Sequence, residues 1–461
     1  MSQRLFAIAV SMLFLCPFGN AATFVTLNRT PGETAFPLKM EAISADGQVA
    51  IGNGWTGAPG LGQRGPVLWR AATGLHILDG DGPFSDNWES PWAEVSAVST
   101  DGSVIAGAGI NNDGDYEAFR WTSEAGAIPI GSLSQSRNLL TVWVAAMTDS
   151  GSAIGGESES PNGQEAFVWT PANGMRGLGD LPGGEFRSGI LGMTPDAKTM
   201  VGYATSERGW EAVRWTEETG FVPLGDLPGA GDVGPYGRTA SLISNDGKVV
   251  VGGFGGQSFR WTAETGMVGL GDLPGGDTFS GVTDMTPNGT TIVGMAEMNR
   301  GSESIGDSFI WDAARGMRSL TDVAIRDYGL TQILVEGVGG RVDAVRGVSD
   351  DAKVLVGWDW VIDLRDGPSD GDANFDGAVD LSDFGTLKQN FGAGIWRDQG
   401  DLDDNDRVDL SDFGILKANF GRGPAAAPEP ATVTLATVGA LLLLIDGRRC
   451  FRRRSSGADL P

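Results

Sequence analysis

The sequence is poor in the residues that build disulfide frameworks, imidazole-based sites and nucleic-acid surfaces. Its 461 residues include two cysteines, one histidine and 33 lysines plus arginines, against 59 aspartates plus glutamates. Because Cys16 and Cys450 lie near the two ends, no disulfide framework supports the chain between them. A single histidine, His76, argues against a Ser-His-Asp triad and against a histidine-rich zinc site. The net charge of −26 argues against a nucleic-acid partner, which requires a basic surface.

Glycine, in contrast, is abundant at 72 residues, and much of it belongs to an internal repeat. The clearest mark of the repeat is an apolar core that ends in tryptophan, as in Ala118-Phe119-Arg120-Trp121. The repeated tryptophans are Trp69, Trp121, Trp169, Trp215, Trp261 and Trp311, spaced 46 to 52 residues apart. A glycine follows each of them after five residues, and this fixed offset predicts a hairpin turn.

Two further marks accompany the tryptophans. An Asp-Gly dipeptide between short apolar runs precedes Trp69, Trp121 and Trp261, as at Asp46-Gly47 and Asp246-Gly247, and predicts two strands joined by a tight turn. A Leu-Gly-Asp-Leu-Pro segment follows three of them, at 178–182, 224–228 and 270–274. Each period therefore predicts four short strands: before the Asp-Gly turn, after it, through the tryptophan, and through the Leu-Gly-Asp segment.

Four strands in about 48 residues are typical of a β-propeller blade, so we expect residues 22–366 to form an all-β repeat domain of this kind. The segment 24–32 matches a repeat ending at 221–229, whereas the last repeat, from Val345 to about Leu364, lacks such an ending. An N-terminal strand that completes this last blade would remove two open edges. Counting the shared unit predicts a seven-bladed propeller, with six blades as the alternative.

These repeats resemble the HAF family of extracellular repeats. The resemblance depends on the Ala-Phe-x-Trp core, the Leu-Gly-Asp-Leu-Pro-Gly-Gly stretch and the Asp-Gly-x-Val-Val-Gly hairpin, and it covers residues 22–366. It implies secretion and repetition, and it supplies no reaction.

A second repeat, with an offset of 29 residues, lies near the C-terminus. The stretches 372–383 and 401–412 each place oxygen-bearing side chains at positions 1, 3, 5, 9 and 12 of a twelve-residue loop. This is the ligand pattern of a calcium loop, in which position 7 contributes its backbone carbonyl. The predicted ligands are Asp372, Asn374, Asp376, Ala378, Asp380 and Asp383 in the first loop, and Asp401, Asp403, Asn405, Arg407, Asp409 and Asp412 in the second. Ala378 and Arg407 would contribute their carbonyls, and the sequence therefore predicts two Ca²⁺ sites.

Each loop runs into a short helical pattern, at 381–391 and 410–420. The tandem units at 368–423 resemble a type I dockerin, an EF-hand-like calcium module that docks extracellular assemblies. The resemblance implies a cohesin-like partner. An acidic linker is the alternative, but it predicts no common register. Loop position 6 is Gly377 in the first copy and Asp406 in the second, so we expect the second site to bind calcium more weakly.

The N-terminus has the pattern of a secretory signal peptide over residues 1–21. Arg4 supplies the positive region, the apolar stretch 5–15 follows, and Gly19-Asn20-Ala21 offers small residues before the cleavage point. The sequence therefore predicts export of the chain.

The C-terminus has three parts in a fixed order. The linker 424–430 ends in Pro-Glu-Pro, the apolar segment 431–447 follows, and the tail 448–461 is rich in arginine. The whole resembles a PEP-CTERM sorting signal, with an ordinary membrane anchor as the alternative. The resemblance implies transient membrane insertion of a helix at 431–447 and cleavage by an exosortase-type enzyme. Together the two ends predict a secreted or envelope-surface protein.

Carboxylate pairs are the remaining route to catalysis, because glycoside hydrolases use two acids at a set separation. The candidates by residue type are Glu117, Glu165, Glu211, Asp180, Asp226 and Asp272. Each set of three occupies equivalent repeat positions, which favours structural roles, and we expect the aspartates to cap their own turns. The repeated tryptophans are expected in the core, and His76 on a strand surface.

The sequence thus predicts a non-catalytic binding or assembly protein with a calcium-dependent docking module. Two alternatives stay open. In the first, the propeller is a carbohydrate-active enzyme or a lectin for an extracellular polysaccharide, tethered by the module. In the second, the chain is a calcium-stabilised structural spacer without a docking partner.

Overall fold

The computed structural model describes residues 22–26, 39–56, 63–77, 94–110, 116–134, 142–230, 237–274, 279–300, 303–336 and 341–422. The chain divides into two compact units, with the division between Gly367 and Pro368. The predicted segments 1–21, 424–430, 431–447 and 448–461 lie outside the described residues. Within those residues, no helix is long and apolar enough to cross a membrane.

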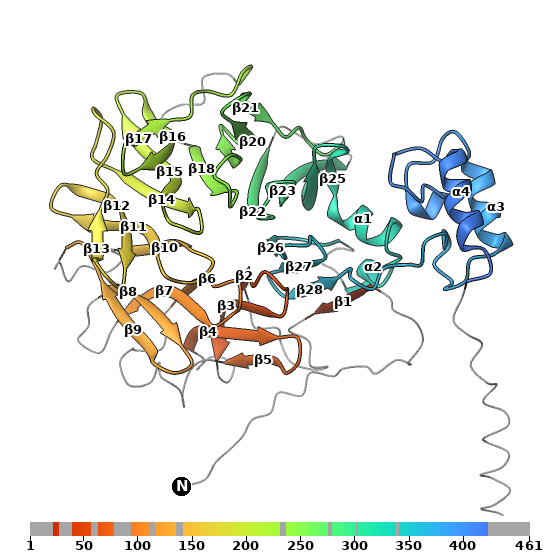
Figure 1. Cartoon of the computed structure of the whole chain (residues 1–461), viewed down its shortest axis with the longest axis horizontal. Helices are drawn as coiled ribbons and strands as arrows, with labels where there is room; N and C mark the ends of the chain where they lie inside the picture. Colours follow the sequence, from red (N-terminus) through yellow and green to blue (C-terminus); the bar gives the residue numbers. More distant parts are fainter. Residues whose placement is uncertain are drawn as a thin grey trace, which may run out of the picture. The chain divides into compact units, whose positions relative to one another are not determined.

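The first unit is a ring of seven four-stranded antiparallel sheets (Figure 1). Blade 1 contains β2 (Lys39–Ile43), β3 (Val49–Thr56), β4 (Gln63–Arg70) and β5 (Gly74–Ile77). Blade 2 contains β6 (Glu94–Val98), β7 (Val104–Ile110), β8 (Tyr116–Thr122) and β9 (Gly126–Gly131). Blade 3 contains β10 (Val142–Met147), β11 (Ile154–Ser160), β12 (Gly163–Thr170) and β13 (Gly174–Gly177).

Blade 4 contains β14 (Ser188–Met193), β15 (Thr199–Ser206), β16 (Gly209–Thr216) and β17 (Gly220–Pro223). Blade 5 contains β18 (Arg238–Ile243), β19 (Val250–Phe254), β20 (Gln257–Thr262) and β21 (Gly266–Gly269). Blade 6 contains β22 (Ser280–Met285), β23 (Thr291–Arg300), β24 (Glu303–Asp312) and β25 (Gly316–Ser319), and the helices α1 (Leu320–Arg326) and α2 (Ile333–Glu336) follow it. Blade 7 contains β26 (Val345–Val348), β27 (Val354–Gly357), β28 (Trp360–Asp363) and β1 (Thr23–Thr26).

The seven-bladed propeller is confirmed, and the six-bladed alternative is wrong. The first strand of each blade contacts the first strands of both neighbours, including β2 with β26, and this closes the ring. The N-terminal strand β1 pairs with β28, with Thr23 opposite Asp363 and Thr26 opposite Trp360. The expectation that the N-terminus completes the last blade is therefore also confirmed.

The predicted position of the fourth strand is wrong. In blades 3, 4 and 5 this strand begins at the repeat glycine and ends before the Leu-Gly-Asp segment, which forms the connection to the next blade. The glycines of this segment have positive φ angles: 81° at Gly179, 91° at Gly225 and 82° at Gly271. The left-handed backbone and the following proline, which lacks an N–H, end the ladder there.

The Asp-Gly segments form the turns between the first and second strands, as predicted. In blade 1, Ser44 Oγ donates to Asp46 Oδ1 at 2.7 Å and accepts from Val49 N at 3.0 Å. Gly47 completes the turn with a φ of 67°, and a Cβ placed on it would lie 2.7 Å from Val354 Cβ of blade 7. This glycine therefore supplies both the turn and the close approach of two blades.

The repeated tryptophans pack between blades, as expected. Trp121 and Trp215 are buried within apolar clusters. The partly buried members, each packed against such a cluster, are Trp69, Trp169, Trp261 and Trp311. Their indoles are thus part of the core rather than platforms for a ligand.

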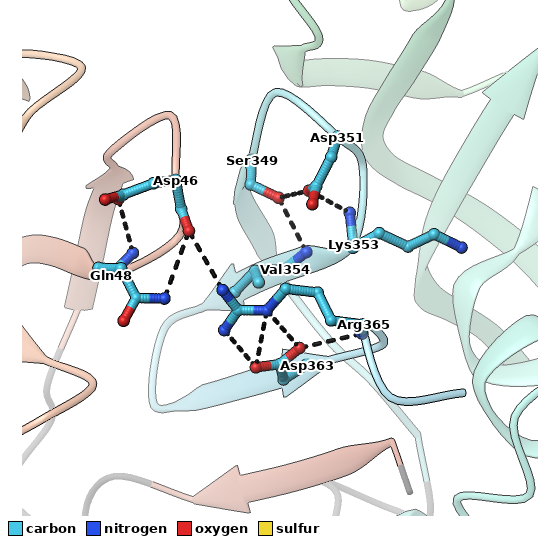
Figure 2. A network of polar contacts seen from close by, with 8 residues as sticks. All are labelled: Asp46, Gln48, Ser349, Asp351, Lys353, Val354, Asp363 and Arg365. Carbon is cyan, nitrogen blue, oxygen red and sulfur yellow. Dashed lines mark hydrogen bonds and ion pairs between the residues drawn. The ribbon is translucent and has the colours of Figure 1, made fainter. Parts of the chain in front are cut away.

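Polar contacts join blade 7 to blade 1 at the closure of the ring (Figure 2). Arg365 Nε donates to Asp363 Oδ1 and Oδ2 at 2.9 and 3.1 Å, and its Nη1 donates to Asp46 O at 3.4 Å. Asp363 ends β28, the strand that pairs with β1. One guanidinium thus links the closing strand pair to the hairpin turn of blade 1.

The second unit contains α3 (Leu381–Asn390), the short 3-10 helix η2 (Arg397–Gln399) and α4 (Leu410–Asn419) (Figure 1). Both long helices begin where the sequence predicts and end one residue earlier. The core consists of three pairs of residues that are 29 positions apart. They are Ala373 with Leu402, Val379 with Val408, and Leu387 with Leu416.

We expect Gly47→Ala to destabilise the propeller more than Gly220→Ala does. Both glycines have positive φ, 67° and 63°, but a Cβ at Gly220 meets nothing within 4 Å. Gly220→Ala should therefore cost about 1–2 kcal/mol for backbone strain alone, and Gly47→Ala about 1–3 kcal/mol more for overpacking against Val354. Urea unfolding followed by tryptophan fluorescence measures the difference.

The addition of Val354→Ala to Gly47→Ala tests the cause. If the two side chains collide, the double variant should be more stable than the sum of the single effects by about 1 kcal/mol or more. Strictly additive effects would contradict the proposed contact.

Candidate metal centre

Positions 9 and 12 of each predicted calcium loop hold the start of a helix. Asp380 is the N-cap of α3, where its Oδ1 accepts from Ser382 N at 2.7 Å, and Asp383 Oδ2 accepts from Asp380 N at 2.8 Å. Asp409 and Asp412 form the same capping box at α4. The sequence Asp-Leu-Ser-Asp thus begins a helix by satisfying its free N–H groups, and it fixes two predicted ligands.

The first loop folds around two buried carboxylates. Asp383 is fully buried, and its Oδ1 accepts from Ala373 N at 2.8 Å and from Asn374 N at 3.2 Å. Asp372 is 2% exposed, and its Oδ2 accepts from Gly377 N at 3.0 Å. Asp372 Oδ1 is buried without a hydrogen-bond partner. A buried, unpaired carboxylate oxygen is costly, and a bound cation would satisfy it.

The second loop has the same arrangement. Asp412 Oδ1 accepts from Leu402 N at 2.6 Å and from Asp403 N at 3.2 Å, and Asp401 Oδ1 accepts from Asn405 N at 3.1 Å. One carboxylate oxygen each from Asp401, Asp403 and Asp412 lies within 4.8 Å of the others. Three hard oxygen donors therefore converge, which is the ligand chemistry that calcium prefers.

Burial raises the pKa of Asp401 to about 6, and the nearby charges of Asp412 and Asp404 contribute to the shift. Burial also raises the pKa values of Asp372 and Asp403. Without a cation, these carboxylates destabilise one another when they are ionised. A divalent ion would reverse that repulsion.

Loop position 6 forms the required turn in both copies. Gly377 has a φ of 84° and Asp406 a φ of 62°, so aspartate adopts the left-handed backbone that glycine supplies in the first loop. Position 4 is left-handed as well, at Phe375 and Asp404. The substitution at position 6 therefore leaves the shape of the second loop intact.

The remaining predicted ligands lie toward the surface. Asn374 and Asp376 are exposed, and Asn374 Nδ2 donates to Asp376 Oδ2 at 2.8 Å. Ala378 N donates to Asp376 Oδ1 at 2.9 Å. In the second loop, Asn405 and Arg407 are exposed. The structure thus buries positions 1 and 12 in each loop and leaves positions 3 and 5 exposed, although the exposed Asp403 still reaches Asp401 and Asp412 in the second loop.

The two loop–helix units are interlocked in a way that the sequence analysis did not foresee. Val379, at position 8 of the first loop, accepts from Gly421 N and donates to Arg422 O, both after α4. Val408, at position 8 of the second loop, pairs in the same manner with Gly392 and Gly394, after α3. In the sequence, the only sign of this pairing is that Val379 and Val408 share the 29-residue offset of the repeat. Each loop is therefore held by the chain that follows the other helix.

The acidic candidates of the propeller act in the contacts between strands and blades. Glu165 Oε1 accepts from Gly179 N at 3.0 Å, and the buried Glu211 lies 3.9 Å from an Arg238 nitrogen. Asp180 accepts from Thr205 N and Oγ1 of the next blade, both at 3.1 Å. Asp180 also accepts from Arg187 N of its own connecting segment at 2.8 Å, so its carboxylate joins its own turn to the neighbouring blade.

The other candidates have the following positions. Asp226 pairs with Arg208 at 2.6 Å. Glu117 lies in β8 opposite Gly109, Asp272 is exposed after β21, and His76 lies in β5 opposite Leu68.

The propeller also contains a groove of about 620 Å³ between blades 3 and 4, lined in part by Arg176, Trp215 and Glu217. Arg176 pairs with Glu217 at 2.7 Å and lies over Trp215, so these groups satisfy one another.

No protein-family model matches the chain, and no curated protein matches it. Among solved structures, it is similar to an oligogalacturonate lyase from Vibrio parahaemolyticus, at 10% identity and a TM-score of 0.47, over 75% of this chain and 97% of that one. It is also similar to TolB from Acinetobacter baumannii, at 12% identity and a TM-score of 0.36, over 70% and 82% of the two chains. At these values the similarities carry no functional argument.

We expect Asp401→Asn to stabilise the second unit in the presence of a chelator at pH 7.5. The pKa of Asp401 is raised in the folded state, so its contribution to stability is present below about pH 4 and lost as the pH rises through about 6. An amide mimics the neutral carboxyl, so the gain should be on the order of 2 kcal/mol. Hydrogen exchange of the amides in 401–422 measures it.

The matched control is Asp376→Asn in the first loop, because that carboxylate is exposed and should give no gain. Faster exchange in Asp401→Asn than in the wild type would contradict the proposed repulsion.

Proposed function

We propose that this chain is an exported, non-catalytic assembly protein of the cell surface, whose second unit binds two calcium ions and docks a protein partner. The observation that supports calcium most directly is the buried Asp372 Oδ1, which no protein donor satisfies. The convergence of Asp401, Asp403 and Asp412 supports the second site. Hard oxygen donors without cysteine or histidine favour calcium over zinc or copper.

The proposed ligands are the side chains at loop positions 1, 3, 5, 9 and 12 and the carbonyls of Ala378 and Arg407. Calcium would supply charge compensation to carboxylates that are otherwise forced together. Positions 9 and 12 are also the capping boxes of α3 and α4. Ion binding therefore stabilises the starts of both helices, and with them the surface that they expose.

The helix starts carry the proposed docking surface. Leu381 is 73% exposed and Leu410 is 74% exposed, and each is followed by an exposed serine. Two large apolar side chains at equivalent positions, so fully open to water, stabilise the fold little and are suited to a protein interface. They favour docking over the spacer alternative, and we propose a cohesin-like partner.

In this proposal the propeller displays surfaces for extracellular ligands, including polysaccharides, while the module attaches the chain to an assembly. The signal peptide 1–21 and the sorting segment 424–461 would direct it to the envelope surface, with processing by an exosortase-type enzyme. A carbohydrate-active enzyme is the second candidate, but the predicted acids Glu165, Glu211 and Asp180 are engaged in structural contacts.

We expect calorimetric titration of the metal-free protein with calcium to give two bound ions. Asp372→Asn and Asp401→Asn should each remove one site or weaken it at least tenfold, because each removes a charged ligand at position 1. Asp370→Asn, a change outside the first loop at an exposed carboxylate, is the matched control and should bind two ions. Unchanged stoichiometry together with unchanged affinity in both ligand variants would contradict the proposal.

We expect the combined change Leu381→Asp and Leu410→Asp to abolish binding of a cohesin-type domain while leaving calcium stoichiometry at two. The physical reason is that charged side chains at both helix starts oppose burial against an apolar partner. Val268→Asp, an equally drastic change at an exposed position of the propeller strand β21, is the control. Surface plasmon resonance with calcium or chelator measures the binding. Retained binding in the double variant would rule out this surface.

A further inference from the structure

Trp143 is the most exposed aromatic side chain on the described first strands of the seven blades. It lies on β10, a first strand, yet it is 51% exposed. The strand pairing defines the equivalent residues of five other blades, which are Lys39, Glu94, Gly189, Thr239 and Gly281. The indole is therefore no part of the repeat pattern, and half of its surface gains nothing from burial.

A fixed polar group lies beside this indole. Trp143 and Glu157 are directly opposite in the β10–β11 pair, which places their Cβ atoms about 4.5–5.5 Å apart on one face of the sheet. Glu157 is buried, and it accepts from Gln164 Nε2 at 3.1 Å and from the Tyr203 hydroxyl of the next blade. Burial raises the pKa of Glu157. The carboxylate is thus held in one orientation by two blades.

Tyr203 continues into a stack of planar groups. Its ring stacks on Trp210 at 4.5 Å with an interplanar angle of 8°, and the Arg187 guanidinium lies 5.1 Å from the centre of that indole. Gly189 makes room for the stack, because a Cβ there would meet the Tyr203 ring at 2.8 Å. Arg187 Nε is buried and has no hydrogen-bond partner. That nitrogen is closed to solvent, whereas Arg187 as a whole is only partly buried.

We propose that Trp143, Glu157, Gln164, Tyr203 and Arg187 form a binding site for a neutral oligosaccharide. The apolar face of a pyranose ring stacks on an exposed indole, while its hydroxyls bind fixed carboxylate, amide and guanidinium groups. An exposed aromatic beside a few convergent polar groups is the composition that such a site requires. The net charge of −26 disfavours a polyanionic ligand.

A purely structural role explains only part of this cluster. The contacts of Glu157 with Tyr203, and of Tyr203 with Trp210, do join blades 3 and 4. Trp143 is the exception, because truncation of a half-exposed side chain removes little packing. The proposed site lies in the propeller and does not depend on calcium, so its failure and the failure of the calcium module are distinguishable.

The test is calorimetric titration of the protein with the neutral sugars cellohexaose, xylohexaose, laminarihexaose and mannohexaose and with the charged hexagalacturonate, in calcium and in chelator. We expect at least one neutral sugar to bind with a millimolar or tighter Kd in both buffers. Trp143→Ala should weaken that binding at least tenfold, and Trp143→Phe should restore part of it, because a smaller ring still stacks. Val222→Ala, at an exposed position on β17, is the matched control and should bind as the wild type does.

Glu157→Gln provides a second test, because it keeps the side-chain size and one of the two acceptor oxygens while it removes the charge. We expect it to weaken binding severalfold in protein that stays folded by circular dichroism. Failure of all four neutral sugars to bind, unchanged affinity in Trp143→Ala, or a preference for hexagalacturonate over every neutral sugar would overturn the proposal.

Discussion

The propeller depends on the contact between each hairpin turn and the second strand of the preceding blade. A Cβ added to the turn glycine would lie 2.6 to 2.8 Å from a valine in or directly before that strand for Gly102 with Val49, Gly151 with Val104, and Gly289 with Val249. Blade 5 is looser, because a Cβ on Gly247 would lie 3.5 Å from Thr194. Gly47 makes the closer kind of contact with Val354 across the closure of the ring. The interface between blades 7 and 1 therefore packs in the same way as interfaces between consecutive blades. The ring can close because its first and last blades contact each other as neighbouring blades do.

The two blades with alanine in this turn show how the contact adapts. Ala197 and Ala352 have φ angles of 54° and 57°, so the backbone retains the left-handed turn at some cost in strain. Ala197 packs against a cluster that contains Ala153, a smaller residue at the position where the other blades have valine or threonine. Size is thus exchanged across the interface, as expected where interiors are close-packed.

Most of the architecture could be predicted from the sequence because its signals are local and repeated. The Asp-Gly turns, the tryptophan strands and the helix starts at Leu381 and Leu410 depend on residues close together in the chain. The closing strand β1 was also predictable, because it completes a repeat that the last blade lacks. The fourth strands were misplaced because a hydrophobic Leu-Gly-Asp segment resembles a strand until its left-handed glycine ends the ladder.

What the sequence could not give are contacts between segments that only the fold brings together. The spacing predicted the calcium ligands, but not that Val379 and Val408 each pair with the chain after the other helix. It identified Asp180 as a repeated acid, but not its bonds to Thr205 of the next blade. Trp143, Glu157 and Tyr203 carried no signal, because the residue type of each does not recur at the equivalent position of the other blades.

There is a physical reason why the repeat could not predict Trp143, Glu157 and Tyr203. In a repeat protein, positions that recur in every blade serve the blade, and the shared turn, glycine and tryptophan account for packing. A site for one ligand has to break the repetition, because seven equal blades present seven equal surfaces. The residues after the glycine of each second strand are Asn53, Ala108, Glu157, Tyr203, Gly253, Met295 and Trp358. This one position varies in size and charge from blade to blade, although Asn53, Ala108, Glu157 and Tyr203 are all buried there. Blades 3 and 4 use it to place a carboxylate against a phenol beside an exposed indole, and the departure from the repeat is what makes that surface specific.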